Sequence, residues 1–240
     1  MSRKVISTPS KVRSAYESFL EAFCEIVQNA NRNVSFPDAP VASCFTDSGG
    51  GTTVEFKRCL YLKDWPCRKL PASKRLDVAL MAREEITRDS WLLKSSTVYL
   101  NYFVVSNTTA FLVQSLHYDF VEGGQPHHPF FHVQLTHEPI PEADLRSTGF
   151  DLQLKLQEPS SECWVTTKIP TSDMTLASVI YCLVADHLGA DFFGEFAKRV
   201  HSIQERLPPP IFDALKDSIQ KSSAHFKSSH WFAHMRGPAQ

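Results

Sequence analysis

The sequence predicts an α+β fold, in which an antiparallel meander sheet is packed by an N-terminal helix and by C-terminal helices. Short segments rich in β-branched and aromatic residues follow one another through the middle of the 240-residue chain. Short turns separate these segments, which favours antiparallel pairing of neighbours in a sheet with one buried face. Segments with helical periodicity stand on either side of this run.

The composition is that of a globular protein. Hydrophobic residues make up 42% and charged residues 21%, which excludes general disorder, and the formal net charge of -1 gives no overall basic field for nucleic acid. The six cysteines form no CxxC pair and do not resemble a zinc ribbon or a disulfide scaffold. The first residues carry no apolar signal-peptide core, and no apolar run approaches the ~18 residues of a membrane span. We therefore expect a cytoplasmic protein with reduced thiols and without a metal or cofactor.

The first third of the chain predicts a helix, a hairpin and a second helix. Residues 10–31 form an amphipathic helical pattern with Ser10 as a candidate N-cap. Residues 41–62 read as two strands joined by a glycine-rich turn, which favours a hairpin over a phosphate-binding loop because a strand and not a helix follows. Residues 72–90 are predicted to be helical, with leucine, alanine and isoleucine side chains on one face.

Strand-like segments then dominate, and a helical region closes the chain. The predicted strands span residues 96–105, 109–120, 129–136, 150–157 and 163–170. An apolar helix is expected over 174–188, with Ser172 or Asp173 as its N-cap and Gly189 as its C-cap. A further helix over 190–207 ends at three consecutive prolines. We divide the chain into an α+β domain, 1–207, and a C-terminal helical extension, 208–240.

One hairpin concentrates chemically active side chains. GGQPHHPFFHVQL covers residues 123–135, and the strand before it ends in His117-Tyr118-Asp119. Alternate strand residues share a face, so hairpin pairing can place His117, Asp119, His132 and Gln134 on one surface. Two histidines and a carboxylate are the parts of a metal site or of a general acid–base pair. The same pattern also fits a half-exposed strand pair with no chemical role.

The hairpin resembles the strand motif of the histidine-triad nucleotide hydrolases and transferases. Gly124 and Gln125 stand where that motif has glycine and glutamine, and His132 begins a segment similar to its end. The resemblance implies attack of a histidine on phosphorus. This chain departs from the motif because three residues separate His128 from His132, which moves the second imidazole about 7 Å further along the strand.

A longer stretch, roughly residues 115–190, resembles an uncharacterised prokaryotic family of unknown function. In that family an HPxxHxQ strand is followed by a basic-Ile-Pro-Thr segment and an apolar helix. The matching positions here are His128, Pro129, His132, Gln134, Lys168, Ile169, Pro170 and Thr171. The resemblance implies no activity. It implies that the hairpin and the later segment form one structural unit, and it suggests an operon for defence against phages or mobile elements.

These observations leave two hypotheses for the function. The first is a non-catalytic binding or assembly subunit of a cytoplasmic prokaryotic complex, because no complete catalytic signature is present. Its predicted contacts with a larger protein partner are Ile211, Leu215, Ile219, Phe226 and Trp231. The mildly basic tail is expected to touch nucleic acid weakly, and no membrane contact is expected.

The second hypothesis is a phosphoesterase or nucleotide-processing enzyme that uses residues 117–134. His132 would act as base or nucleophile, His128 and His117 would assist, and Asp119 would orient an imidazole.

Overall fold

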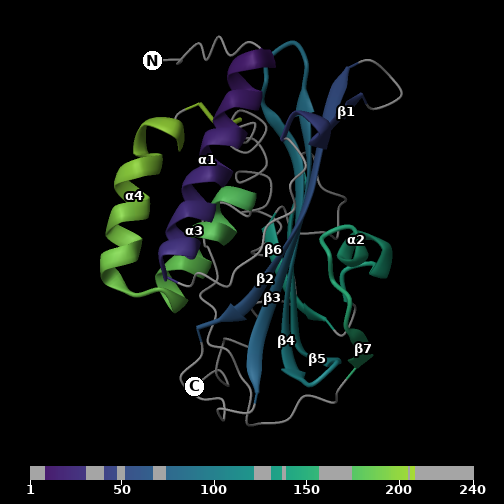
Figure 1. The fold of residues 1–240 in the computed structure, drawn as a ribbon. Coiled ribbons are helices and arrows are strands. Elements are labelled where there is room, and N and C mark those ends of the chain that lie inside the picture. The colour runs from purple at the N-terminus through teal and green to yellow at the C-terminus, as the bar shows by residue number, and fades with distance from the viewer. Residues whose placement is uncertain are drawn as a thin grey trace, which may run out of the picture.

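A long antiparallel sheet forms the centre of the computed structural model (Figure 1). The structure describes residues 9–30, 41–47, 52–66, 74–121, 131–136, 139–156, 175–204 and 206–208. Within these ranges the strands are β1 (Phe45–Asp47), β2 (Thr53–Trp65), β3 (Arg75–Thr87), β4 (Leu93–Ser106), β5 (Thr109–Val121), β6 (Phe131–Thr136) and β7 (Gln153–Leu156). The first six neighbour one another in chain order, and β7 pairs in parallel with the start of β5.

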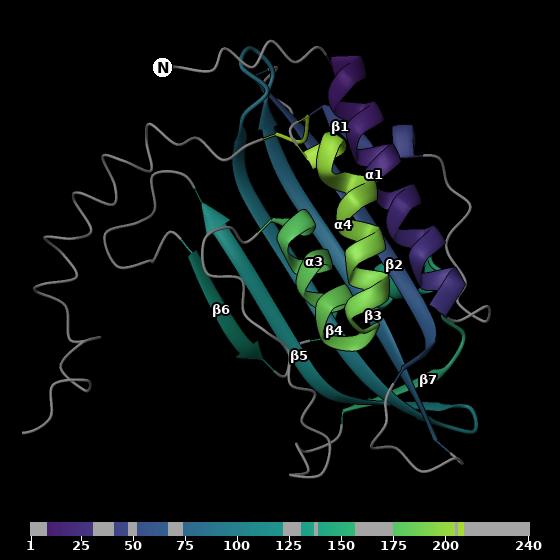
Figure 2. The ribbon, with the colours of Figure 1, turned by 90° about the vertical axis from the view of Figure 1, so that its left-hand side faces the viewer.

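The two faces of the sheet are covered differently. Three helices stack on one face, seen on the left of Figure 1 and in front in Figure 2: α1 (Pro9–Ala30), α3 (Leu176–His187) and α4 (Ala190–Gln204). The short helix α2 (Glu142–Arg146) lies on the opposite face, which we call the α2 face. A 3-10 turn, η1 (Val41–Cys44), leads into β1.

The larger core lies between the sheet and the three helices. Tyr16 of α1 stacks on Phe56 of β2 with ring centroids 4.4 Å apart. Phe196 of α4 meets Phe19 of α1 at 5.6 Å and Tyr181 of α3 at 5.2 Å. These interlocking aromatic side chains fix the three helices against one another as well as against the sheet.

A smaller core lies on the α2 face. Phe150 packs its ring edge against Tyr61 of β2 at 5.1 Å, and Ile140 and Leu145 are fully buried beside it. The segment that contains α2 therefore covers one end of this face. Both faces of the central strands are buried at that end, since Ala79 and Phe103 are inaccessible to solvent.

The predicted fold class is confirmed, and so is most of the order of elements. The N-terminal helix begins at Pro9, so Ser10 lies inside it and is not its N-cap. The strand pairing predicted within 41–62 is present as β1 and β2, but Val41–Cys44, expected in the first strand, form the 3-10 turn η1. The predicted helix over 72–90 is wrong, because residues 75–87 form β3, a strand paired on both sides. No helix in the described ranges has the length and apolar character needed to cross a membrane.

The C-terminal predictions are confirmed in part. Helix α3 is capped by Thr175, whose side chain accepts a hydrogen bond from the backbone N–H of Ser178, and not by either predicted residue. Gly189 follows the helix with φ of 87°, a conformation that favours glycine. The strand predicted over 150–157 is shorter than expected. The strand predicted over 163–170 and the extension beyond residue 208 lie outside the described residues.

Candidate functional site

The histidine-bearing strands pair as the sequence predicts. β5 and β6 are antiparallel neighbours, with Asp119 opposite His132 and His117 opposite Gln134. Directly opposed residues of an antiparallel pair share a face, so these four positions belong to the α2 face. The side chain of His132 and all of His128 lie outside what the structure describes.

His117 and Asp119 contact each other along β5. The imidazole Nε2 lies 3.1 Å from Asp119 Oδ1, and the two side chains are 20% and 13% exposed. An imidazole this close to a carboxylate can be oriented by it or can share a ligand with it. The Nε2 atom of His117 is itself buried, so the contact between the two side chains is shielded from solvent.

Two residues of β4 support this pair from the other side. The hydroxyl of Thr97 donates a hydrogen bond of 2.8 Å to Asp119 Oδ1. The ring of Tyr99 lies parallel to the imidazole of His117, with centroids 4.3 Å apart and an interplanar angle of 8°. The hydroxyl fixes the carboxylate and the stack fixes the imidazole plane, so both groups are preorganised.

The sequence analysis did not find Thr97 or Tyr99. Their positions opposite Asp119 and His117 could be found only from the register of the hairpin between β4 and β5, whose turn pairs Ser106 with Thr109. A bulge between Tyr102 and Phe103 shifts that register by one residue. A count back from the turn that ignores this bulge therefore pairs His117 with Val98, which belongs to the larger core on the opposite face.

The pair lies in two rows of side chains that cross five strands of the α2 face. One row runs Lys57, Arg83, Thr97, Asp119, His132, and the next runs Cys59, Met81, Tyr99, His117, Gln134. Arg83 forms an ion pair with Glu55, and Lys57 forms one of 2.8 Å with Asp144 of α2. Positive and negative groups therefore balance, which disfavours a phosphate backbone as the ligand of this surface.

Asn101 of β4 and Ser115 of β5 form a third row, at which the segment that contains α2 begins to cover the α2 face. Asn101 donates to the hydroxyl of Ser115 at 2.7 Å, and its carbonyl oxygen accepts the backbone N–H of Ile140 at 2.6 Å. Asn101 is fully buried. The candidate site thus stands directly beside a firmly anchored edge of the smaller core.

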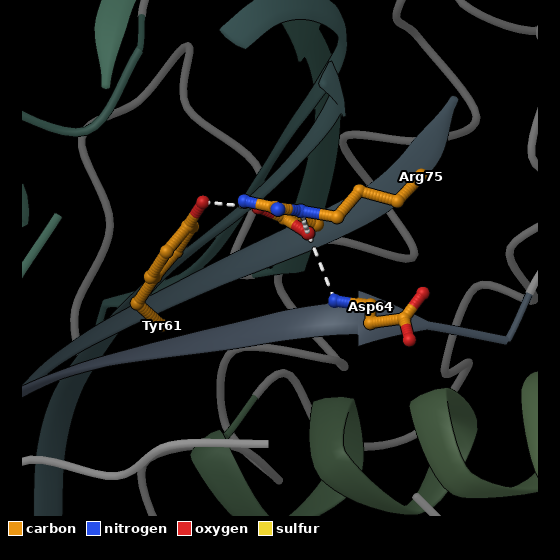
Figure 3. A network of polar contacts seen from close by, with 4 residues as sticks. Tyr61, Asp64 and Arg75 are labelled. Atoms are coloured by element: carbon orange, nitrogen blue, oxygen red, sulfur yellow. Dashed lines mark hydrogen bonds and ion pairs between the residues drawn. The ribbon is translucent and has the colours of Figure 1, made fainter. Parts of the chain in front are cut away.

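A second polar cluster surrounds Asp77 at the start of β3 (Figure 3). Its carboxylate accepts hydrogen bonds from the hydroxyl of Tyr61, from the backbone N–H of Asp64 at 2.8 Å and from Arg75 at 3.0 Å. Burial, together with the neighbouring carboxylate, raises the pKa of Tyr61 far above its usual value near 10. These contacts hold the irregular end of β2, where the register shifts before Trp65, so we assign this cluster a structural role.

The predicted partner contacts Ile211, Leu215, Ile219, Phe226 and Trp231 lie outside the described residues. Within the described ranges, no three histidine, cysteine or acidic side chains form a group that holds a metal ion.

Comparison with known proteins gives no relative. No protein-family model, curated protein or solved structure matches the chain. The two resemblances drawn from the sequence therefore stay predictions.

Proposed function

We propose that this protein is a non-catalytic binding or assembly subunit that docks on a larger protein through the α2 face. The supporting observation is the pair of cross-strand rows around His117 and Tyr99, where ionic and aromatic side chains are already held by their neighbours. Preorganised side chains lose little conformational freedom on binding. A half-buried tyrosine beside an exposed arginine, Arg83, is also typical of interface centres.

The finer parts of this proposal come from the sequence. A cytoplasmic location is the expectation drawn from the pattern of cysteines and from a sequence with no signal-peptide core or long apolar run. An operon for phage or mobile-element defence is implied by the resemblance to the prokaryotic family. The predicted apolar stripe of Ile211, Leu215, Ile219 and Phe226, together with Trp231 of the tail, would add a second contact with the same partner. The basic tail would add a weak contact with nucleic acid.

The test is affinity capture of the tagged full chain from its native host at low salt, followed by mass spectrometry. The variants are Arg83→Glu on the α2 face and, as a matched control, Lys198→Glu on the exposed surface of α4. We expect one stoichiometric protein to be retained by the wild type and by the control but lost from Arg83→Glu. Equal retention by all three proteins would contradict docking through the α2 face.

An enzyme acting on phosphate esters or nucleotides is the second candidate. It is favoured by the contact between His117 and Asp119 and by the register that sets His132 opposite Asp119. In this scheme His132 is base or nucleophile, His128 and His117 assist, and Asp119 orients an imidazole. His132→Ala would then abolish hydrolysis of a nucleotide substrate without lowering Tm. If the protein is a binding subunit, the wild type hydrolyses no nucleotide and His132→Ala changes nothing in this assay.

A further inference from the structure

We propose that the outer edge of β6 is a docking site for a strand of this same chain, residues 163–170, which pair with β6 in the antiparallel sense. This inference goes beyond the proposed function, because it concerns an edge of the sheet and not the α2 face. It rests on the place and composition of β6 and on the points at which the chain leaves β7 and enters α3.

β6 stands at the outer edge of the sheet, beside β5 (Figure 2). Within the described ranges β6 pairs with β5 alone, so alternate backbone N–H and C=O groups on its outer side require another partner. β7 does not supply this partner, because it pairs with Thr109–Leu112 of β5, beyond the end of β6. A further strand can therefore be added to the sheet at this edge.

The composition of β6 suits a covered edge. Strands that stay at an open edge usually carry lysine or proline, or contain a bulge, because these features prevent pairing with another strand. The part of β2 that β1 does not cover has such features, namely Lys57, Lys63 and the bulge before Trp65. β6 reads FHVQLT, without lysine or proline, and it pairs with β5 without a bulge. Its sequence is thus typical of a strand paired on both sides.

The connection from β7 to α3 travels along β6 in the opposite direction to that strand. β7 ends at Leu156, opposite Leu112, on the same side of β5 as β6, since β4 occupies the other side. α3 begins at Leu176, whose backbone N–H donates to Glu84. Glu84 lies in the cross-strand row that contains Phe131, the first residue of β6. β6 runs from that row toward the row of Leu112, so the connection passes it antiparallel.

The length of the connection leaves room for a strand. The rows that the connection joins are separated by about eight residues of β5, which corresponds to about 26 Å. The connection, residues 157–174, has about 18 residues, and an extended chain of that length reaches roughly 60 Å. A strand of about six to eight residues fits beside β6, and the remainder can form the turns on either side of it.

Residues 163–170, CWVTTKIP, have the strand pattern that this edge requires. Val133 of β6 packs against the larger core, whereas Gln134 is exposed. Antiparallel pairing can place Val165 and Ile169 on the side of Val133, where they extend the apolar row. It then places the threonine and lysine that alternate with them on the side of Gln134.

Two other occupants of this edge can be distinguished, a strand from a second copy of the chain and a strand from a partner protein. Both require a collision between molecules, whereas the segment 163–170 is tethered on each side to elements next to the edge and is present there at high effective concentration. The isolated chain at low concentration therefore separates the three cases.

The experiment is amide hydrogen exchange of the purified, isotope-labelled full chain, followed by NMR at two protein concentrations about tenfold apart. In an open edge strand only alternate amides are hydrogen-bonded, so exchange rates alternate along residues 132–135, whereas in a covered strand all of them are slow. The variants are Thr166→Pro and Thr167→Pro, because one of two neighbouring N–H groups is directed at β6 in either register. The matched control is Ser160→Pro, which lies before the segment. Circular dichroism verifies that each variant is folded.

We expect slow exchange without alternation over residues 132–135 in the wild type and in Ser160→Pro, at both concentrations. At least one of Thr166→Pro and Thr167→Pro should accelerate exchange of alternate β6 amides at least about tenfold, while exchange in β3 stays unchanged. If neither proline variant folds, short distances between the Hα atoms of residues 132–135 and 163–170 in the wild type replace this result, and their absence contradicts the proposal.

Three results overturn the proposal. Alternating rates in the wild type would mean that the isolated chain leaves this edge open. Protection that appears only at the higher concentration would identify a second copy as the occupant. Protection that survives in both folded proline variants would mean that another segment covers β6. None of these results involves the α2 face, so docking on a larger protein is tested separately.

Discussion

At the scale of single residues, His187 joins the end of α3 to two strands. Its Nε2 lies 3.3 Å from the hydroxyl of Tyr102, its ring stands edge-on to Trp65 at 5.8 Å, and it bonds to the backbone of Pro66. Burial lowers the pKa of His187 below its usual value of 6.5, although the nearby carboxylate of Asp186 opposes this shift. The neutral imidazole is therefore the form that the folded protein stabilises.

This histidine makes stability depend on pH. A lowered pKa means that the unfolded chain binds the proton more readily, so the contribution of His187 is complete above the unfolded pKa and is lost as pH falls through the folded pKa. We expect the free energy of unfolding to fall between about pH 7.5 and about pH 5 more steeply in the wild type than in His187→Gln. Urea denaturation across this range measures it, with exposed His201→Gln as the control that keeps the wild-type slope.

At the scale of elements, Glu84 of β3 links two helices to the sheet through hydrogen bonds. This carboxylate of β3 is 1% exposed and accepts hydrogen bonds from the hydroxyl of Tyr16 in α1, from Ser96 of β4 at 2.9 Å and from the backbone N–H of Leu176 at 2.9 Å. The last of these donors is at the first residue of α3, where the helix dipole also favours a negative charge. One buried carboxylate thus fixes the start of α3 and the middle of α1 on β3 and β4.

Glu84→Gln should destabilise the protein strongly although it changes the shape of the side chain little. One carboxylate oxygen becomes an amide NH₂ group, which cannot accept, so at least one buried donor loses its partner. We expect a loss of about 2–4 kcal/mol in the free energy of unfolding. Glu85→Gln, on the partly exposed side of the same strand, should cost less than about 1 kcal/mol. Equal losses in the two variants would argue against the joining role of Glu84.

The sequence analysis failed most clearly at the central strand β3, which it predicted to be a helix. Residues 75–87 are rich in alanine, leucine, methionine and glutamate, which favour helices, and burial of both faces removes the alternation that marks a half-exposed strand. Tertiary packing overrides this local preference. Asp77 and Glu84 were therefore missed, whereas the pairing of His117 and Asp119 with β6 was predicted because residues 109–136 keep clear strand patterns. Thr97 and Tyr99 were missed because the sequence gives no signal for the bulge in β5, where Val113 is the extra residue.

At the scale of the whole molecule, the sheet is strongest at its centre. β3 and β4 are each hydrogen-bonded on both sides along nearly their full length, and they lie between the larger core and the smaller one. β7 is four residues long, pairs only with the start of β5 within the described ranges, and carries Leu156 with 65% exposure. Global unfolding is needed to open β3 and β4, whereas local fraying is enough to open β7.

Amide hydrogen exchange should therefore be graded across the sheet. We expect the slowest exchange in β3 and β4, because their backbone N–H groups become accessible only when both cores separate. Exchange in β7 should be faster by several orders of magnitude, since its opening removes only the partly buried Leu154 from the margin of the smaller core. Exchange followed by NMR or mass spectrometry in the native buffer measures both. If amides over 75–87 exchange as fast as those over 153–156, residues 75–87 are not the central strand on which the packing of α1 and α3 depends.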